Sequence, residues 1–139
     1  MAVSTPTFSD QMLRAHAALQ EDLQAIKEAL SSPAEVRRQL FALRTHVLDH
    51  FRKEEQGGYM APVLVLQPQQ ERVVQRLMEE HHHLAEALDA LVQEAAAATV
   101  IDDGFRERVW AWAKELRRHE AEENVVVEEA FNRDVGSKD

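Results

Sequence analysis

Four long stretches of this chain carry apolar residues at alternating spacings of three and four, a period that predicts amphipathic helices. The helices are predicted over about 9–31, 33–56, 68–98 and 103–132. Only four glycines and four prolines occur among 139 residues, so little in the sequence interrupts a helix. The predicted stripes contain Met12, Leu19, Leu23, Ile26, Leu30, Leu40, Leu43, Val47, Leu77, Leu84, Leu88, Leu91, Phe105, Val109, Trp112 and Leu116. The sequence therefore predicts an all-α protein.

The connections between the helices predict how they are arranged. Ser32 and Glu35 have the spacing of a capping box with Pro33 at the first helical position, so the second helix follows the first directly. One of the aspartates at 102–103 is a suitable N-cap for the fourth helix. Because both connections are very short, each pair of helices forms an antiparallel hairpin. We expect one domain, residues 1–139, folded as an up-down-up-down antiparallel four-helix bundle.

The second and third helices are joined by a longer connection. Gly57-Gly58 is predicted to end the second helix, because glycine tolerates the left-handed backbone of a C-cap. Residues 59–67 form an apolar connector, and Pro68 suits the first turn of the third helix.

Charge and composition exclude several classes of function. The formal net charge of −9 and the lack of a basic stripe argue against nucleic acid as a partner. There is no cysteine, so disulfides and thiolate metal sites are excluded. No stretch approaches the roughly 18 apolar residues of a membrane span, and residues 1–10 lack the pattern of a signal peptide. We therefore expect a cytoplasmic protein with no membrane partner.

Each of the four apolar stripes runs through a histidine, and two of them carry a glutamate one turn later. The residues are His16, His50, Glu54, His81, His119 and Glu123. Ionisable side chains in a core are costly unless they are neutralised, hydrogen-bonded or coordinated. Residues four apart share a helix face, so each His-x-x-x-Glu pair directs an imidazole and a carboxylate at one metal pair. Residue counts from the turns near Ser32 and Val100 place the two histidines of each hairpin within about 3 Å in height.

These six residues are predicted to bind metal, and a polar core network without metal is the alternative. Carboxylates combined with imidazoles suit iron or manganese, and six ligands favour a dinuclear centre over a closed tetrahedral zinc site. Of the other histidines, His46 suits a position beside the site or on the surface. His82 and His83 are expected to be solvated, although His82 stands four residues before Glu86. For Tyr59, Trp110 and Trp112, core packing is favoured over a role in tuning or gating the site.

The pattern resembles the hemerythrin-like family, whose HHE domains carry histidines and His-x-x-x-Glu motifs in this order on four helices. The matching residues are His16, His50-Phe-Arg-Lys-Glu54-Glu55, Glu80-His81 and His119-Glu-Ala-Glu-Glu123. The resemblance covers roughly residues 9–132. It implies two non-haem iron ions with an oxo, hydroxo or water bridge. It also implies that His16 and His50 hold one iron, His81 and His119 hold the other, and Glu54 and Glu123 bridge them.

Two positions differ from the oxygen-carrying hemerythrins. Ala85 stands where the carriers have a second histidine on the third helix, and Asn124 stands where they commonly have an aspartate. The missing imidazole implies a more open second iron. The resemblance therefore implies a protein that binds or senses O2, or reacts with peroxide or NO, rather than a reversible carrier.

Two other functions are consistent with the sequence. One is a di-iron oxidase or peroxidase acting on a defined substrate, for which the connector Tyr59–Leu66 would serve as a lid. The other is iron storage or a purely structural metal-binding bundle. Whether the protein is an enzyme is left open by the sequence.

Overall fold

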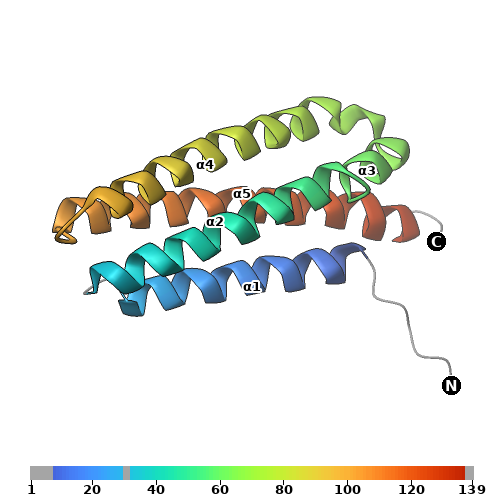
Figure 1. The fold of residues 1–139 in the computed structure, drawn as a ribbon. Coiled ribbons are helices and arrows are strands. Elements are labelled where there is room, and N and C mark those ends of the chain that lie inside the picture. Colours follow the sequence, from blue (N-terminus) through green and yellow to red (C-terminus); the bar gives the residue numbers. More distant parts are fainter. Residues whose placement is uncertain (1–7, 30–31, 137–139) are drawn as a thin grey trace, which may run out of the picture.

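The computed structural model describes residues 8–29 and 32–136, and within them the chain folds into a helical bundle (Figure 1). The helices are α1 (Phe8–Ala29), α2 (Pro33–Glu55), α3 (Met60–Leu66), α4 (Glu71–Ala97) and α5 (Asp103–Gly136), with a 3-10 turn η1 (Pro68–Gln70) before α4. The four long helices run alternately up and down (Figure 1), and around the bundle they follow the order α1, α2, α4, α5. The predicted up-down-up-down four-helix bundle is confirmed.

The caps of α2 and α5 are formed as predicted. The backbone N–H of Glu35 donates to Oγ of Ser32 across 3.4 Å, with Pro33 in the first turn. The backbone N–H of Phe105 donates to Oδ1 of Asp102 across 2.8 Å. Each cap satisfies an N–H group that the first helical turn leaves without a partner. The predicted end of the first helix, at 30–31, lies outside the described residues.

The connection between α2 and α4 is more ordered than the sequence predicted. The segment interpreted as an apolar connector contains α3, which buries Met60 and Val63, three residues apart, against the bundle. The predicted third helix begins at Pro68 only as a 3-10 turn, and regular α-helix starts at Glu71. In a segment of only seven residues, the spacing of apolar side chains cannot distinguish a short helix from an apolar loop.

The two glycines after α2 have different roles. Gly57 has φ of +87°, the left-handed conformation expected after a helix end. Gly58 lies so close to the last turn of α2 that a Cβ there would come within 2.3 Å of the carbonyl oxygen of Lys53. Glycine is therefore required at 58 for a steric reason.

The buried apolar side chains form two clusters separated by the polar residues of the predicted site. The large cluster comprises Leu19, Leu23, Ile26, Val36, Leu40, Leu43, Val47, Phe51, Leu84, Leu88, Leu91, Ala95, Ile101, Phe105, Val109, Trp112, Ala113 and Leu116. The small cluster comprises Met12, Tyr59, Met60, Val63, Val74, Leu77, Val126, Val127 and Ala130. Except for Leu30, which lies outside the described residues, every predicted stripe residue is in one of them.

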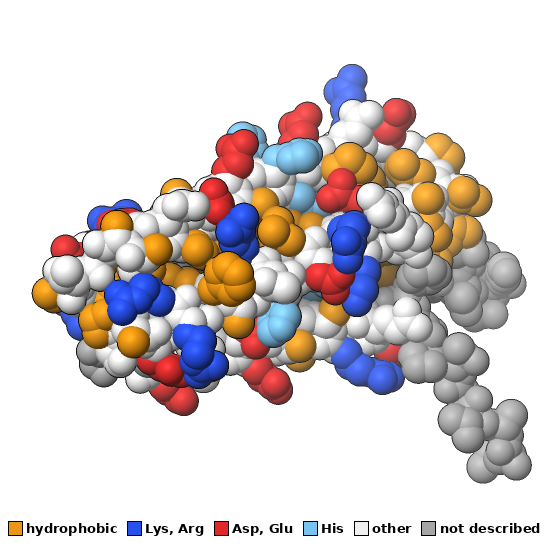
Figure 2. Space-filling view, in the orientation of Figure 1, with side chains coloured by type: hydrophobic (Ala, Val, Ile, Leu, Met, Phe, Trp, Pro, Cys, Tyr) orange, Lys and Arg blue, Asp and Glu red, His pale blue; other side chains and the backbone are white. Residues whose placement is uncertain are grey.

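The surface mixes charges of both signs with scattered apolar side chains. Hydrophobic atoms gather at the α3 end of the face drawn in Figure 2, and Val65 and Leu66 of α3 are exposed. None of the helices within 8–29 and 32–136 combines the length and the apolar composition needed to cross a membrane.

Candidate metal centre

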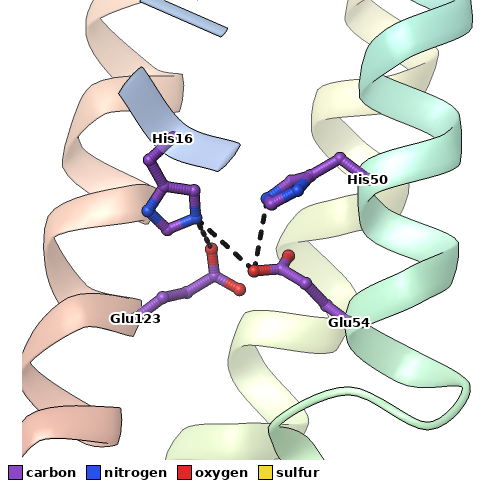
Figure 3. Close-up of side chains that lie close together, drawn as sticks. All are labelled: His16, His50, Glu54 and Glu123. Carbon is purple, nitrogen blue, oxygen red and sulfur yellow. Dashed lines mark ion pairs between the residues drawn. The ribbon is translucent and has the colours of Figure 1, made fainter. Parts of the chain in front are cut away.

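His16, His50, Glu54 and Glu123 converge in the bundle interior from three different helices (Figure 3). Nε2 of His16 lies 3.3 Å from Oε1 of Glu123 and 3.5 Å from Oε2 of Glu54. Nε2 of His50 lies 3.3 Å from the same oxygen of Glu54. One possible ligand atom from each residue lies within 4.8 Å of the others, so the four form a group able to hold a metal ion.

A second group of four shares both glutamates with the first. Nε2 of His81 lies 3.1 Å from Oε1 of Glu54, and Nε2 of His119 lies 3.2 Å from Oε1 of Glu123. The possible ligand atoms of Glu54, His81, His119 and Glu123 again lie within 4.8 Å of one another. The structure thus brings the six predicted residues together as two neighbouring groups, with the two carboxylates common to both.

The atoms that face the centre have no hydrogen-bond partners among the described residues. They are Nε2 of His16, His50, His81 and His119, both carboxylate oxygens of Glu54, Oε1 of Glu123 and Oε2 of Glu120. Buried polar atoms are almost always paired, because an unpaired one costs free energy. Eight such atoms directed at one small volume fit a bound cation, so the donor set suits a metal ion.

Three of the histidines are oriented by oxygen atoms on their outer side. Nδ1 donates to Asn124 Oδ1 across 3.0 Å in His16, to Glu55 Oε2 across 2.8 Å in His81, and to Glu80 Oε1 across 2.8 Å in His119. A carboxylate oxygen only accepts, so in His81 and His119 the proton is held on Nδ1, and the lone pair of a neutral ring is directed from Nε2 toward the centre. Metal-ligating histidines are characteristically held in this way.

Without metal, the buried imidazoles and carboxylates of the cluster shift one another's pKa values. Burial lowers the pKa of His16, but the Glu123 and Glu54 carboxylates outweigh it and raise that pKa to about 10, and the pKa of His81 is raised to about 10 for the same reasons. Burial raises the pKa of Glu123, but contacts with the surrounding imidazoles hold it well below its usual range. Burial also raises the pKa of Glu120 to about 7. A metal ion must therefore displace protons from the imidazoles when it binds.

Sequence reasoning missed several residues that contact the cluster. Tyr59 packs in the small apolar cluster as predicted, and its hydroxyl also donates a 2.6 Å hydrogen bond to Oε2 of Glu123, which the sequence did not predict. Phe51 stacks on His81 with ring centroids 4.0 Å apart. Glu120 is buried beside His16. Phe51 and Glu120 directly follow a site histidine in the sequence, about 100° around the helix, so a search along one stripe passes over them.

The remaining histidines and the tryptophans do not contact the cluster. His46 is exposed, with Nδ1 2.9 Å from Asp22, and therefore takes the surface position of the two that the sequence allowed. His82 and His83 are exposed as expected. Trp112 is buried in the large cluster and donates its Nε1–H to the carbonyl of Leu84 across 2.9 Å.

A cavity of about 320 Å3 reaches the cluster from the end of the bundle that carries α3. Its lining includes His50, Glu54, Lys53, Gly58 and Tyr59. It therefore approaches the group that contains His16 and His50. Its lining does not include His81, the histidine four residues before Ala85.

The fold and the cluster define a helical bundle with a buried histidine and glutamate centre able to hold metal. The family of the hemerythrin HHE cation binding domain matches residues 7–130. The chain belongs to this hemerythrin family. No curated protein and no solved structure matches it.

Proposed function

We propose that this protein holds two non-haem iron ions and uses them to bind or sense O2, or to react with small oxidants such as peroxide or NO. His16, His50, Glu54, His81, His119 and Glu123 are the proposed ligands. The observation that carries the proposal is the convergence on one volume of seven buried nitrogen and oxygen atoms of these residues, none of which has a hydrogen-bond partner among the described residues. Bound iron would supply the redox chemistry, and the protein would supply the ligands and the access.

The shared glutamates support a dinuclear site rather than a mononuclear one. Glu54 presents one oxygen to the imidazoles of His16 and His50 and the other to His81. Glu123 presents Oε1 to His16 of the first group and to His119 of the second, and Oε2 to His81. Carboxylates in these positions are suited to contact two ions at once. Oxygen and imidazole donors together favour iron or manganese over zinc.

The size of the cavity beside His50 and Glu54 favours a small ligand. At about 320 Å3 it lies at the lower limit of pockets that enclose drug-sized molecules. A diatomic molecule or peroxide fits such a space easily. The alternative, an oxidase acting on a drug-sized substrate, would need the whole of this cavity for the substrate.

The test is metal loading under anaerobic conditions with ferrous iron, followed by metal analysis and an absorption spectrum after exposure to air. We expect close to two ions per chain, and absorption bands that depend on oxygen. His50→Ala, Glu54→Ala, His119→Ala and Glu123→Ala should each halve or abolish loading. His83→Ala, on the exposed face of α4, is the matched control and should load fully.

Saturation at one ion per chain would overturn the dinuclear proposal. Absence of any oxygen-dependent or peroxide-dependent spectral change would instead favour storage or a structural metal. Turnover of hydrogen peroxide, measured with the loaded protein, separates an enzyme from a binding protein.

A further inference from the structure

Glu120 is a buried carboxylate beside the six proposed ligands. Neither the sequence pattern nor the proposed function assigns Glu120 a role. Glu120 is only 4% exposed to solvent. Oε1 accepts a 2.7 Å hydrogen bond from Nε2 of Gln20 on α1. Oε2 has no hydrogen-bond partner among the described residues and lies 3.7 Å from Nε2 of His16. The free oxygen is thus directed at the same nitrogen that faces the metal centre.

We propose that Glu120 is a further metal ligand, coordinating through Oε2 the ion held by His16 and His50. This proposal rests on the proposed function, because it requires metal at the cluster. The amide of Gln20 carries no charge, so without metal only the imidazole of His16, 3.7 Å from Oε2, partly compensates this buried carboxylate. A cation bound to Nε2 of His16 would compensate it directly.

The positions of the carboxylates around His16 support this assignment. Oxygen atoms of Glu123, Glu54 and Glu120 lie 3.3, 3.5 and 3.7 Å from Nε2 of His16. Glu54 and Glu123 are already proposed as ligands. Glu120, the residue after His119 in the sequence, lies at nearly the same distance from this nitrogen.

The two metal positions are therefore unequal. Among the described residues, Nε2 of His81 and Nε2 of His119 lie within ion-pair distance of Glu54 and Glu123 alone. The position at His16 and His50 is offered three carboxylates, whereas the position at His81 and His119 is offered two. Because a hard cation binds more tightly as carboxylates are added, the first position should fill first.

Gln20 is a positioning residue in this arrangement. Its amide holds Oε1 of Glu120, which leaves Oε2 as the oxygen that faces the cluster. Neighbours of this kind typically change metal affinity by 10- to 100-fold when they are removed.

The experiment compares the wild type with Glu120→Gln, which retains the shape of the side chain and removes its charge. Ferrous iron affinity is measured anaerobically by competition with a chelator, and thermal unfolding is followed with and without iron. We expect Glu120→Gln to weaken one of the two binding steps by at least 10- to 100-fold and to leave the other nearly unchanged. Glu115→Gln, on the exposed face of the same helix, is the control and should bind as the wild type does.

Thermal unfolding separates a ligand from a structural residue. If Glu120 is a ligand, the metal-free variant should be at least as stable as the metal-free wild type, because a buried charge has been removed. The stabilisation on adding iron should be smaller. Gln20→Leu should show a weaker effect of the same kind.

The possible outcomes distinguish this proposal from the proposed function. Two ions in the wild type with unchanged affinities in Glu120→Gln would overturn the role of Glu120 and leave the dinuclear site intact. One ion in the wild type would overturn the dinuclear site. In that case, weaker binding in Glu120→Gln would still identify Glu120 as a ligand of that ion, and unchanged binding would overturn it.

Discussion

The hydroxyl of Tyr59 donates a 2.6 Å hydrogen bond to Oε2 of Glu123, joining residues that are 64 positions apart in the sequence. Tyr59 lies directly before α3, and Glu123 lies in the middle of α5. The phenol is buried, and burial together with the neighbouring carboxylates raises the pKa of Tyr59 far above its usual value, so the group remains a donor. The connection between α2 and α4 is therefore attached to the cluster through Tyr59.

Replacing this tyrosine by phenylalanine removes only the hydroxyl. We expect Tyr59→Phe to lower the free energy of unfolding of the metal-free protein by about 1–3 kcal/mol, because a buried charged acceptor loses a donor. Urea unfolding followed by circular dichroism measures the change. A variant as stable as the wild type would show that other partners fully compensate Glu123.

The carboxylate behind His119 should affect metal binding without touching the metal. Oε1 of Glu80 accepts from Nδ1 of His119 across 2.8 Å. Glu80→Gln should weaken iron binding about 10- to 100-fold, because the imidazole of His119 becomes a weaker metal ligand and loses its fixed orientation. Glu79→Gln, the exposed neighbour on the same helix, is the control. Equal effects of the two changes in a chelator competition would show that only the surface charge matters.

The turn after α2 should be intolerant of a methyl group at one glycine and more tolerant at the other. Gly57→Ala should cost about 1–2 kcal/mol, the penalty of a left-handed backbone for alanine, since its Cβ meets no atom within 4 Å. Gly58→Ala should cost more, because its Cβ would lie 2.3 Å from the Lys53 carbonyl oxygen and 2.6 Å from Cα of Glu54. Only the second change should also weaken metal binding, since relief of the clash displaces Glu54. Urea unfolding and metal analysis of both variants test this order.

The metal-free protein should lose stability as the pH rises. The pKa values of His16 and His81 are raised from 6.5 to about 10, so their contribution is complete below pH 6.5 and is lost as the pH rises toward 10. The pKa of Glu123 is depressed, so its contribution is present above its ordinary value of 4.5 and is lost as the pH falls through the depressed one. Burial raises the pKa of Glu120 from 4.5 to about 7, so this carboxyl also lowers stability as the pH rises above 4.5. Urea unfolding at several pH values should therefore give a maximum at about pH 5 and a steady loss of stability above it. Constant stability from pH 7 to 10 would contradict this charge assignment.

Metal affinity should change in the opposite direction over the same range. Binding displaces protons from the imidazoles, so affinity rises with pH, and calorimetry in buffers of different ionisation enthalpy should detect the protons released.

The bundle was predictable because its helices and hairpins depend on local signals. Ser32, Pro33 and Asp102 mark the starts of α2 and α5 through contacts within one helical turn. The apolar stripes repeat often enough to show which face of each helix is buried. His16 and His81 could be placed by counting residues from tight turns. Glu120 and Phe51 could not, since their burial depends on which side of α5 and α2 the neighbouring helices cover. The contact between Tyr59 and Glu123 depends on a turn whose path no periodicity encodes.

The separation of the two apolar clusters has a consequence for folding cooperativity. The large cluster joins the helices on the side of the two tight turns, and the small cluster joins them at the α3 end, with the layer of histidines and glutamates between them. Among the described residues, the two clusters of buried apolar side chains do not join across that layer, so without metal the two ends are coupled by the helices that run through both and by the mutually compensating charges between them. Each end is then free to open as a separate unit, and the smaller one should exchange its amide hydrogens first. A metal pair bound by all four long helices would merge the two units into one.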